Sequence, residues 1–306
     1  MTKELTTTND KSKIAFDTSI LAGQLSASSL RKYREDFEAY LAYAVTPEKA
    51  LDPATLARWR TYMADETLMS PNTINRKLAA VKRLMKEAAV QGYVAYEQIA
   101  GFERIEGVKI TALKNRTKPN ARTRISPQEM RRLTMAPDPG TLIGLRDRAI
   151  LHTLASSGVR IAELANLRIS QILRRDNGYF LSVRGKNDAE YRDAYLSAEA
   201  YNAIQQWLQA RPVASEYVFT SFGGRGERLS AQPVSSVGLW KVVCHYASMI
   251  GLPNVKPHDL RRFLGTQLAK VDIRKAQKAL GHKRIDTTAK HYVLDELESG
   301  LTDHLY

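Results

Sequence analysis

Six residues in the second half of the chain have side chains that could act together on a phosphodiester. In sequence order they are Arg160, Lys186, His258, Arg261, His282 and Tyr292. Forked guanidinium groups can bind both non-bridging oxygens of one phosphate, tyrosine can attack phosphorus, and lysine or histidine can move protons. A metal-dependent nuclease would instead need clustered carboxylates, and none stands beside these residues in the sequence. The set predicts phosphoryl transfer to a tyrosine, without a metal ion or other cofactor.

Each of these residues, taken singly, also has an ordinary structural explanation. Arg160 follows the glycine turn of SSGVRIAEL, and Glu163 lies one turn later, where it could support the guanidinium. An arginine in such a place more often forms a surface ion pair. Lys186 lies in a turn, where lysines are usually just solvated, but it is the only lysine between Arg160 and Lys241. The histidines of this region could alternatively be metal ligands, although their long separations match no metal-binding motif.

The elements that must position these residues are mainly helical, with one small antiparallel β-ribbon between residues 169 and 196. Turn residues at 176–178 and 185–188 separate the β-favouring groups of this ribbon. The sequence SPQE from Ser126 is a capping box that starts a helix. Helical spacing of apolar residues predicts further helices, at 141–155, 198–209, 235–250, 258–270, 273–280 and from about 287 onward.

The first part of the chain is predicted to form a small helical domain. Ser28 or Ser29 can cap a first helix, and the pairs at 52–53 and 70–71 place an N-cap before a proline at two more helix starts. Gly92 ends the third helix, and a shorter one is expected over 93–99. The third helix is strongly basic, and we expect it to bind nucleic acid through Arg76, Lys77, Lys82 and Arg83.

Composition and charge patterning divide the chain and limit its class. Residues 1–24 are expected to be a flexible arm, 25–110 the helical domain, 111–125 an exposed basic linker, and 126–306 a second domain. The linker is expected to contact a polyanion through Lys114, Arg116, Lys118, Arg122 and Arg124.

The bulk properties favour a nucleic acid as partner. The chain has 306 residues with 46 Lys and Arg against 32 Asp and Glu, a formal net charge of +14 and a pI near 9.8. A single cysteine excludes an internal disulfide, and no apolar stretch is long enough for a signal sequence or a membrane span. We therefore expect no membrane partner and a cytoplasmic location, at the nucleoid of a prokaryote.

The order of SSGVRIAEL, HDLRR, ALGH and the following tyrosine resembles that of the tyrosine site-specific recombinases or phage integrases, the family of Cre- and Xer-like enzymes. The resemblance implies a two-domain DNA clamp, with a helical, SAM-like core-binding domain and a mixed α/β catalytic domain. It also implies residue roles. Arg160 and Arg261 would hold the scissile phosphate, Glu163 would support Arg160, and Lys186 would protonate the departing 5′ oxygen.

The resemblance extends to the nucleophile and the reaction. His258 would assist proton transfer at Tyr292, His282 would hydrogen-bond the phosphate, and Tyr292 would form the 3′-phosphotyrosyl link. Strand exchange would pass through a Holliday junction, for integration, excision or resolution of DNA. Two departures from the family's pattern are visible: the ribbon turn reads GKNDAEYR in place of GKG-x-K-x-R, and the spacing between His282 and Tyr292 is one residue longer than usual.

Partners and alternatives follow from the same resemblance. The expected substrate is double-stranded DNA with inverted-repeat half-sites, on which the protein would assemble as a tetramer. Residues 294–306 carry leucines at helical spacing with acidic residues and no Lys or Arg, so this segment is expected to be a helix that docks on a neighbouring subunit. A type IB topoisomerase, a telomere-resolving enzyme and a catalytically inactive DNA-binding accessory protein remain alternatives.

Overall fold

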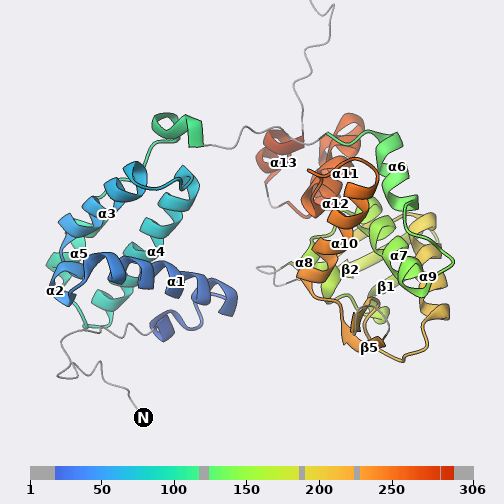
Figure 1. Ribbon diagram of the computed structural model, residues 1–306, viewed down its shortest axis with the longest axis horizontal. Helices are drawn as coiled ribbons and strands as arrows, with labels where there is room; N and C mark the ends of the chain where they lie inside the picture. Colours follow the sequence, from blue (N-terminus) through green and yellow to red (C-terminus); the bar gives the residue numbers. More distant parts are fainter. Residues whose placement is uncertain (1–17, 117–123, 186–189, 224–227, 283, 293–306) are drawn as a thin grey trace, which may run out of the picture. The chain divides into compact units, whose positions relative to one another are not determined.

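The computed structural model describes residues 18–116, 124–185, 190–223, 228–282 and 284–292, without the side chains of residues 18, 19, 98, 287 and 290–292. The chain divides into two compact units, residues 1–121 and 122–306 (Figure 1). The first unit is helical in its described part. The second unit combines helices with two small antiparallel sheets. This confirms the expected fold class.

Helix starts in the first unit follow the capping signals in the sequence. Its elements are η1 (Thr18–Leu21), α1 (Ala27–Ala44), α2 (Pro47–Ala50), α3 (Pro53–Asp65), α4 (Pro71–Val90), α5 (Tyr96–Glu103) and η2 (Ile110–Arg116). Asp52 and Ser70 cap α3 and α4 as predicted, each accepting a backbone N–H. The cap of α1 is Ser26, earlier than expected, because its hydroxyl accepts the Ser29 N–H. Each such cap stabilises its helix by about 1 kcal/mol.

Apolar faces of α1, α3, α4 and α5 enclose the core of the first unit. Aromatic contacts join them, with the rings of Tyr40 and Trp59 5.2 Å apart. Other fully buried residues are Leu56, Ile74, Val81, Leu84 and Phe102. The α4 residues Ile74, Val81 and Leu84 recur at the helical spacing on which the prediction rested.

Two boundaries of the first unit differ from the sequence prediction. Residues 18–24 were expected to belong to a flexible arm, but Thr18–Leu21 forms a 3₁₀ helix with Leu21 fully buried in the core. The predicted linker begins within η2, where Leu113 packs against the same core. The sequence prediction placed both segments outside the helical domain because their local composition is polar. Single apolar residues, Leu21 and Leu113, nevertheless pack them against its core. Residues 1–17 and 117–123 lie outside the described part.

The second unit contains the three-stranded sheet that the sequence predicts and a hairpin that it does not. Its elements are α6 (Pro127–Met135), α7 (Leu142–Ser157), α8 (Ile161–Ala165), η3 (Ile169–Gln171), β1 (Ile172–Arg175), β2 (Gly178–Val183), β3 (Arg192–Leu196), α9 (Ala198–Ala210), β4 (Thr220–Gly223), β5 (Arg228–Pro233), α10 (Ser236–Met249), α11 (Pro257–Val271), α12 (Ile273–Leu280) and α13 (Ile285–Tyr292). Strands β1, β2 and β3 pair antiparallel in that order, and β4 pairs with β5.

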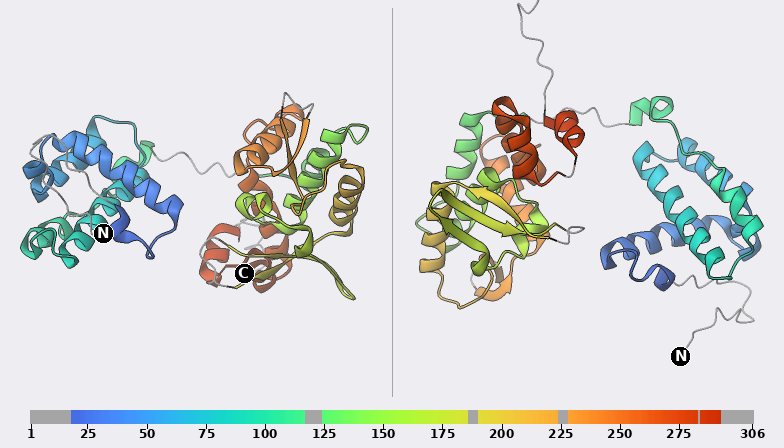
Figure 2. Two further views of the ribbon diagram at one scale, coloured as in Figure 1. Left: turned by 90° about the horizontal axis from the view of Figure 1, so that it is seen from below. Right: turned by 180° about the vertical axis from the view of Figure 1, so that it is seen from behind.

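Helix α7 runs through the core of the second unit. Its residues Ile150, Leu151 and Leu154 are buried beside Trp207 of α9 and Leu260 of α11. In the right-hand view of Figure 2 the three-stranded sheet lies in front of the helices of this unit. The sheet contacts α7, α9 and α12, so it can fix the end of α12 relative to α7. None of the described helices has both the length and the apolar character that a membrane span requires.

Candidate active site

A left-handed glycine turn presents the first arginine of the site. Gly158 ends α7 with φ of 59°, and Arg160 is the N-cap residue of α8. A Cβ atom on Gly158 would lie 2.8 Å from Leu264 and 3.1 Å from Leu280. Glycine is therefore required here both by the backbone conformation and by the close approach of α11 and α12.

Glu163 holds Arg160 by two hydrogen bonds, as the sequence suggests. The Arg160 backbone N–H donates to Glu163 Oε2 at 2.7 Å, and its Nη1 donates to Oε1 at 2.9 Å. The Glu163 side chain is only 3% exposed, whereas that of Arg160 is 45% exposed. The arginine is thus anchored at one side and accessible at the other, which suits a group that must bind an anion from solvent.

The second arginine, Arg261, is buried and bound to backbone. It is 3% exposed, and it donates to the carbonyl of Gly158 and to that of Leu280, the latter at 2.5 Å. Its Nη2 also lies 3.3 Å from Nε2 of His282. These contacts fix the guanidinium beside the turn that carries Arg160. The structure therefore brings the two predicted arginines to one place.

His282 is presented by a second left-handed glycine. Gly281 ends α12 with φ of 62°, and the His282 Nδ1 atom lies 2.9 Å from Thr288 Oγ1. Because a guanidinium has no acceptor, the contact with Arg261 leaves Nε2 as the acceptor and assigns the proton to Nδ1. In this tautomer the Nδ1–H donates to the Thr288 hydroxyl.

The last turn of α12 joins two arginine networks. One is formed by Arg160 and Glu163, and the other by Arg261 and the carbonyls that it binds. The carbonyls of Ala279 and Leu280 accept hydrogen bonds from Arg192 and Arg261 respectively. Carbonyls at the end of a helix lack intrahelical partners and carry partial negative charge, so guanidinium groups stabilise them. Arg192 also donates to Glu163.

Charge at this place favours an anion. Arg160 and Arg192 bind one carboxylate, that of Glu163, and Arg261 adds a third positive charge beside the same turn, so these four side chains sum to 3 − 1 = +2. A phosphodiester bears one negative charge, and its oxygens accept hydrogen bonds from forked guanidinium groups.

The remaining predicted catalytic residues are located only in part. His258 is exposed in the first turn of α11, three residues before Arg261. Tyr292 is the last residue of α13, which contacts α11 and α12, but its side chain is not described. Lys186 and the segment 294–306 lie outside the described residues. The roles assigned to these residues stay predictions.

Two residues of the site were not predicted. Arg192 was noticed only within the GKNDAEYR departure from the family's pattern, and Thr288 not at all. Both act through long-range contacts, Arg192 with Glu163 and Thr288 with His282. The one available signal for Thr288 is its position four residues before Tyr292, one helical turn away.

The basic residues of α4 have partners within the first unit that the charge pattern did not reveal. Arg76 and Lys77 pair with the buried carboxylate of Asp36, and Lys82 donates to the carbonyl of Ile105. Burial lowers the pKa of Lys82. Arg83 is exposed and binds the side-chain oxygen of Gln24. Their contact with nucleic acid remains a prediction.

The predicted linker is described only in part. Lys114 and Arg116 belong to η2, and Arg124 is exposed just before α6. Lys118 and Arg122 lie outside the described residues.

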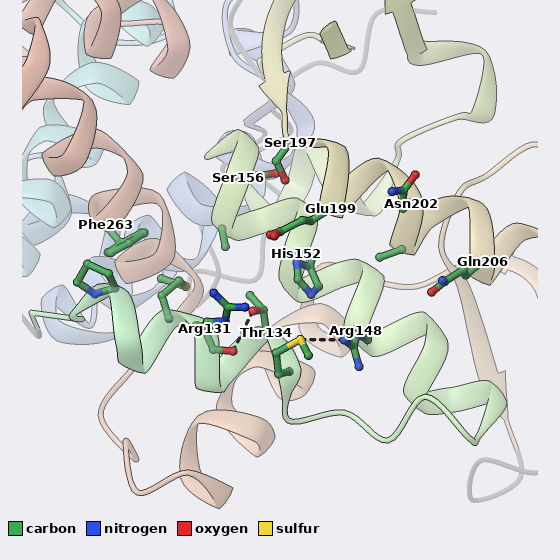
Figure 3. Close-up of a pocket in the computed structure, with 15 residues that line it drawn as sticks. Arg131, Thr134, Arg148, His152, Ser156, Ser197, Glu199, Asn202, Gln206 and Phe263 are labelled. Atoms are coloured by element: carbon green, nitrogen blue, oxygen red, sulfur yellow. Dashed lines mark hydrogen bonds between the residues drawn. The ribbon is translucent and has the colours of Figure 1, made fainter.

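An open groove of about 600 Å³ in the second unit is not lined by Arg160, Arg192 or Arg261. Figure 3 shows its walls, formed by α6, α7 and α9 with Phe263 of α11. Within it Arg148 donates to Met135 Sδ at 2.8 Å, and burial lowers the pKa of His152. None of the six predicted catalytic residues lines this groove. In the described part of the chain, no three His, Cys, Asp or Glu side chains gather as metal ligands.

Comparison with known proteins places this site in a family. Residues 123–297 match the phage integrase family, and residues 16–92 match its N-terminal SAM-like domain. The chain is 26% identical to tyrosine recombinase XerD of Listeria innocua over 279 residues, covering 86% of this chain and 87% of that protein. It is 29% identical to tyrosine recombinase XerC of Pelobacter propionicus over 284 residues, covering 89% and 87%.

Solved structures show the same fold. The XerH site-specific recombinase bound to palindromic difH substrate has a TM-score of 0.68 at 20% identity, covering 89% of this chain and 78% of that one. The Tn1549 transposon integrase in complex with circular intermediate DNA has a TM-score of 0.67 at 15% identity, covering 93% and 95%.

The family match extends over more than half of the chain, and the two arginines and His282 of its motifs meet at one place. The protein belongs to the phage integrase family, the tyrosine recombinases. Its activity is site-specific recombination, in which DNA strands are cleaved and religated.

Proposed function

We propose that Tyr292 cleaves DNA at a phosphate held by Arg160, Arg261 and His282. One observation carries this assignment: both arginine networks and His282 meet at the end of α12, and Thr288 joins α13 to the same histidine. Tyr292 follows Thr288 by one turn of α13, so the two positions share a helix face.

The reaction conserves the number of phosphoester bonds. The Tyr292 oxygen forms a bond to phosphorus as the bond from phosphorus to the 5′ oxygen breaks, which leaves a 3′-phosphotyrosyl link and a free 5′ hydroxyl. His258 takes up the tyrosine proton and Lys186 protonates the departing oxygen. Religation is the reverse reaction with an incoming 5′ hydroxyl. Neither direction needs an external energy source.

The two arginines act differently on the phosphate. Arg261 is fixed before DNA arrives, because carbonyls of Gly158 and Leu280 hold it. A guanidinium fixed in this way is a preorganised donor for the charge that develops in the transition state, and one such donor is worth about 10²–10³ in rate. Arg160 is accessible and moves from Glu163 toward the phosphate as the complex forms.

DNA is held by the basic surfaces of both units. Arg83 and Arg124 are exposed, and Lys114, Lys118 and Arg122 belong to the same basic stretch of sequence. These groups bind the phosphate backbone without reading sequence and make affinity fall with salt. With Arg76, Lys77, Lys82 and Arg116 they form the proposed DNA-binding set, in which the first three also stabilise the first unit.

The assembly we propose is a tetramer on two sites, each made of inverted-repeat half-sites. The two units clamp duplex DNA, and exchange of one strand pair after the other passes through a Holliday junction. The acidic, leucine-spaced segment 294–306 docks on a neighbouring protomer, since it has no Lys or Arg to bind DNA. The reaction takes place in the cytoplasm, at the nucleoid.

The test is capture of the covalent intermediate. Wild-type protein is incubated with a library of nicked duplexes of randomised sequence, and complexes that survive SDS are recovered and their DNA sequenced. Tyr292→Phe is expected to bind DNA but to give no SDS-stable complex, while the matched control Tyr306→Phe retains it. An undiminished complex with Tyr292→Phe would refute the assignment.

A further inference from the structure

Arg192 is the arginine that ends GKNDAEYR, and the resemblance assigned it no role, yet it touches both halves of the site. It is the first residue of β3 and pairs with Val183, the last residue of β2. Its side chain is 16% exposed and points away from the strand pair toward α8 and α12, as its contacts require.

The guanidinium of Arg192 binds two segments that are far apart in sequence. Its Nη2 donates to Glu163 Oε2 at 2.9 Å, and its Nη1 donates to the carbonyl of Ala279 at 3.0 Å. Glu163 belongs to α8 and fixes Arg160, while Ala279 lies in the last turn of α12, three residues before His282. A planar fork is needed to make both contacts, and a lysine ammonium cannot reproduce its geometry.

The Arg192 side chain packs directly against the turn before His282. Gly281 has φ of 62°, and a Cβ atom there would overlap Cδ and Nε of Arg192. The absence of a side chain at Gly281 therefore lets the Arg192 stem lie directly against the turn. Loss of Arg192 would remove this packing contact and the hydrogen bond to Ala279, both of which hold the backbone that presents His282.

Charge balance gives Arg192 a second effect on the site. The Glu163 carboxylate is almost fully buried and has two cationic partners, Arg160 and Arg192. A buried carboxylate needs a compensating cation. While Arg192 supplies it, Arg160 is able to leave Glu163 for a phosphate. If Arg192 were neutral, Glu163 would bind Arg160 more tightly and compete with the phosphate.

We propose that Arg192 is a positioning residue for strand cleavage, which neutralises Glu163 so that Arg160 can bind the scissile phosphate, and fixes the α12 turn that presents His282. The inference rests on the proposed function of Arg160 and His282. It assigns Arg192 no contact with DNA.

The experiment compares Arg192→Gln, Arg192→Lys and the double variant Arg192→Gln with Glu163→Gln. The matched control is Arg175→Gln, because Arg175 forms an exposed ion pair with Asp193 on the same sheet. Single-turnover formation of the SDS-stable complex is measured at saturating nicked duplex, together with DNA affinity and thermal stability. Hydrogen exchange at residues 161–164 and 279–282 is measured on free protein.

Arg192→Gln is expected to slow cleavage by about 100-fold, as displaced catalytic groups do, with DNA affinity nearly unchanged. Arg192→Lys is expected to be slowed less, because it keeps the charge but not the fork. Adding Glu163→Gln removes the charge that captures Arg160, so the double variant is expected to cleave about tenfold faster than Arg192→Gln alone. Exchange at both segments rises in the Arg192 variants but not in the control.

Cleavage by Arg192→Gln at the wild-type rate would overturn the proposal. So would a double variant slower than Arg192→Gln, since a purely structural role predicts added damage and no rescue. If wild-type protein forms no SDS-stable complex, the proposed function fails. Hydrogen exchange on the free protein then tests separately whether Arg192 positions the two segments. Unchanged exchange at 161–164 and 279–282 in Arg192→Gln would refute the positioning role.

Discussion

Arg261→Lys is expected to weaken both the second unit and strand cleavage, because the buried guanidinium has structural and catalytic partners at once. It donates to the carbonyls of Gly158 and Leu280, and both of these residues are buried. A lysine ammonium at this position can reach one of the two carbonyls but lacks the fork to bind both.

The expected loss of stability follows from the one backbone carbonyl, of Gly158 or Leu280, that lysine would leave without a donor. Leaving one buried polar group unsatisfied costs about 1–3 kcal/mol, and the lost contact of Arg261 with His282 adds roughly 1 kcal/mol. A loss of about 2–4 kcal/mol corresponds to a fall of at least roughly 4 °C in the Tm of a unit this large. Cleavage is expected to fall by about 10²–10³ through loss of a preorganised donor.

Arg160→Lys provides the contrast. This side chain is 45% exposed, and lysine preserves its charge beside Glu163, so the stability change is expected to stay within about 1 kcal/mol. Its cleavage rate is nevertheless expected to fall by about 10²–10³. Calorimetry and single-turnover cleavage separate the two cases. A wild-type Tm for Arg261→Lys, or equal destabilisation by both variants, would contradict the conclusion that buried Arg261 stabilises the second unit through its two backbone carbonyls.

Three further predictions concern single contacts. Thr288→Val removes the hydroxyl that binds His282 and is expected to slow cleavage about fivefold, the equivalent of roughly 1 kcal/mol, at unchanged DNA affinity; a wild-type rate would exclude this contact from the mechanism. Asp36→Asn removes the buried partner of Arg76 and is expected to destabilise the first unit by about 1–3 kcal/mol in urea titration, and an unchanged midpoint would refute it. Burial lowers the pKa of His152, so the folded state binds its proton more weakly than the unfolded state does. Stability should therefore fall as the pH drops below about 6.5, less so in His152→Gln, and equal pH slopes would contradict this.

Local signals in the sequence were sufficient to predict the helix starts and to single out the two arginines that the structure brings together. Capping residues such as Ser70 and Ser126 act on backbone groups within four residues, so they can be read from the chain alone. Arg160, Arg261 and His282 were found because each stands in a recognisable local motif, next to a glycine or on one helix face. The structure confirms that these three come together, which the motifs alone could not show.

Residues whose role depends on tertiary contacts were missed or assigned differently. Arg192 reaches Glu163 across 29 positions, and nothing near it in sequence indicates that contact. Lys77 and Lys82 were read as part of a nucleic-acid surface because charge pattern does not show that Asp36 and the Ile105 carbonyl lie beside them. Hairpin β4–β5 was also missed, since its short strands have little of the alternating pattern that identified β1 to β3.

The most direct test of the account is to identify the amino acid that becomes linked to DNA. SDS-stable complexes are digested with nuclease and trypsin, and the tryptic peptide that begins at His291, which contains both Tyr292 and the control position Tyr306, is fragmented by mass spectrometry. The account predicts a phosphate-linked nucleotide on Tyr292 and an unmodified Tyr306. A nucleotide on Tyr306, or on any residue other than Tyr292, would contradict it.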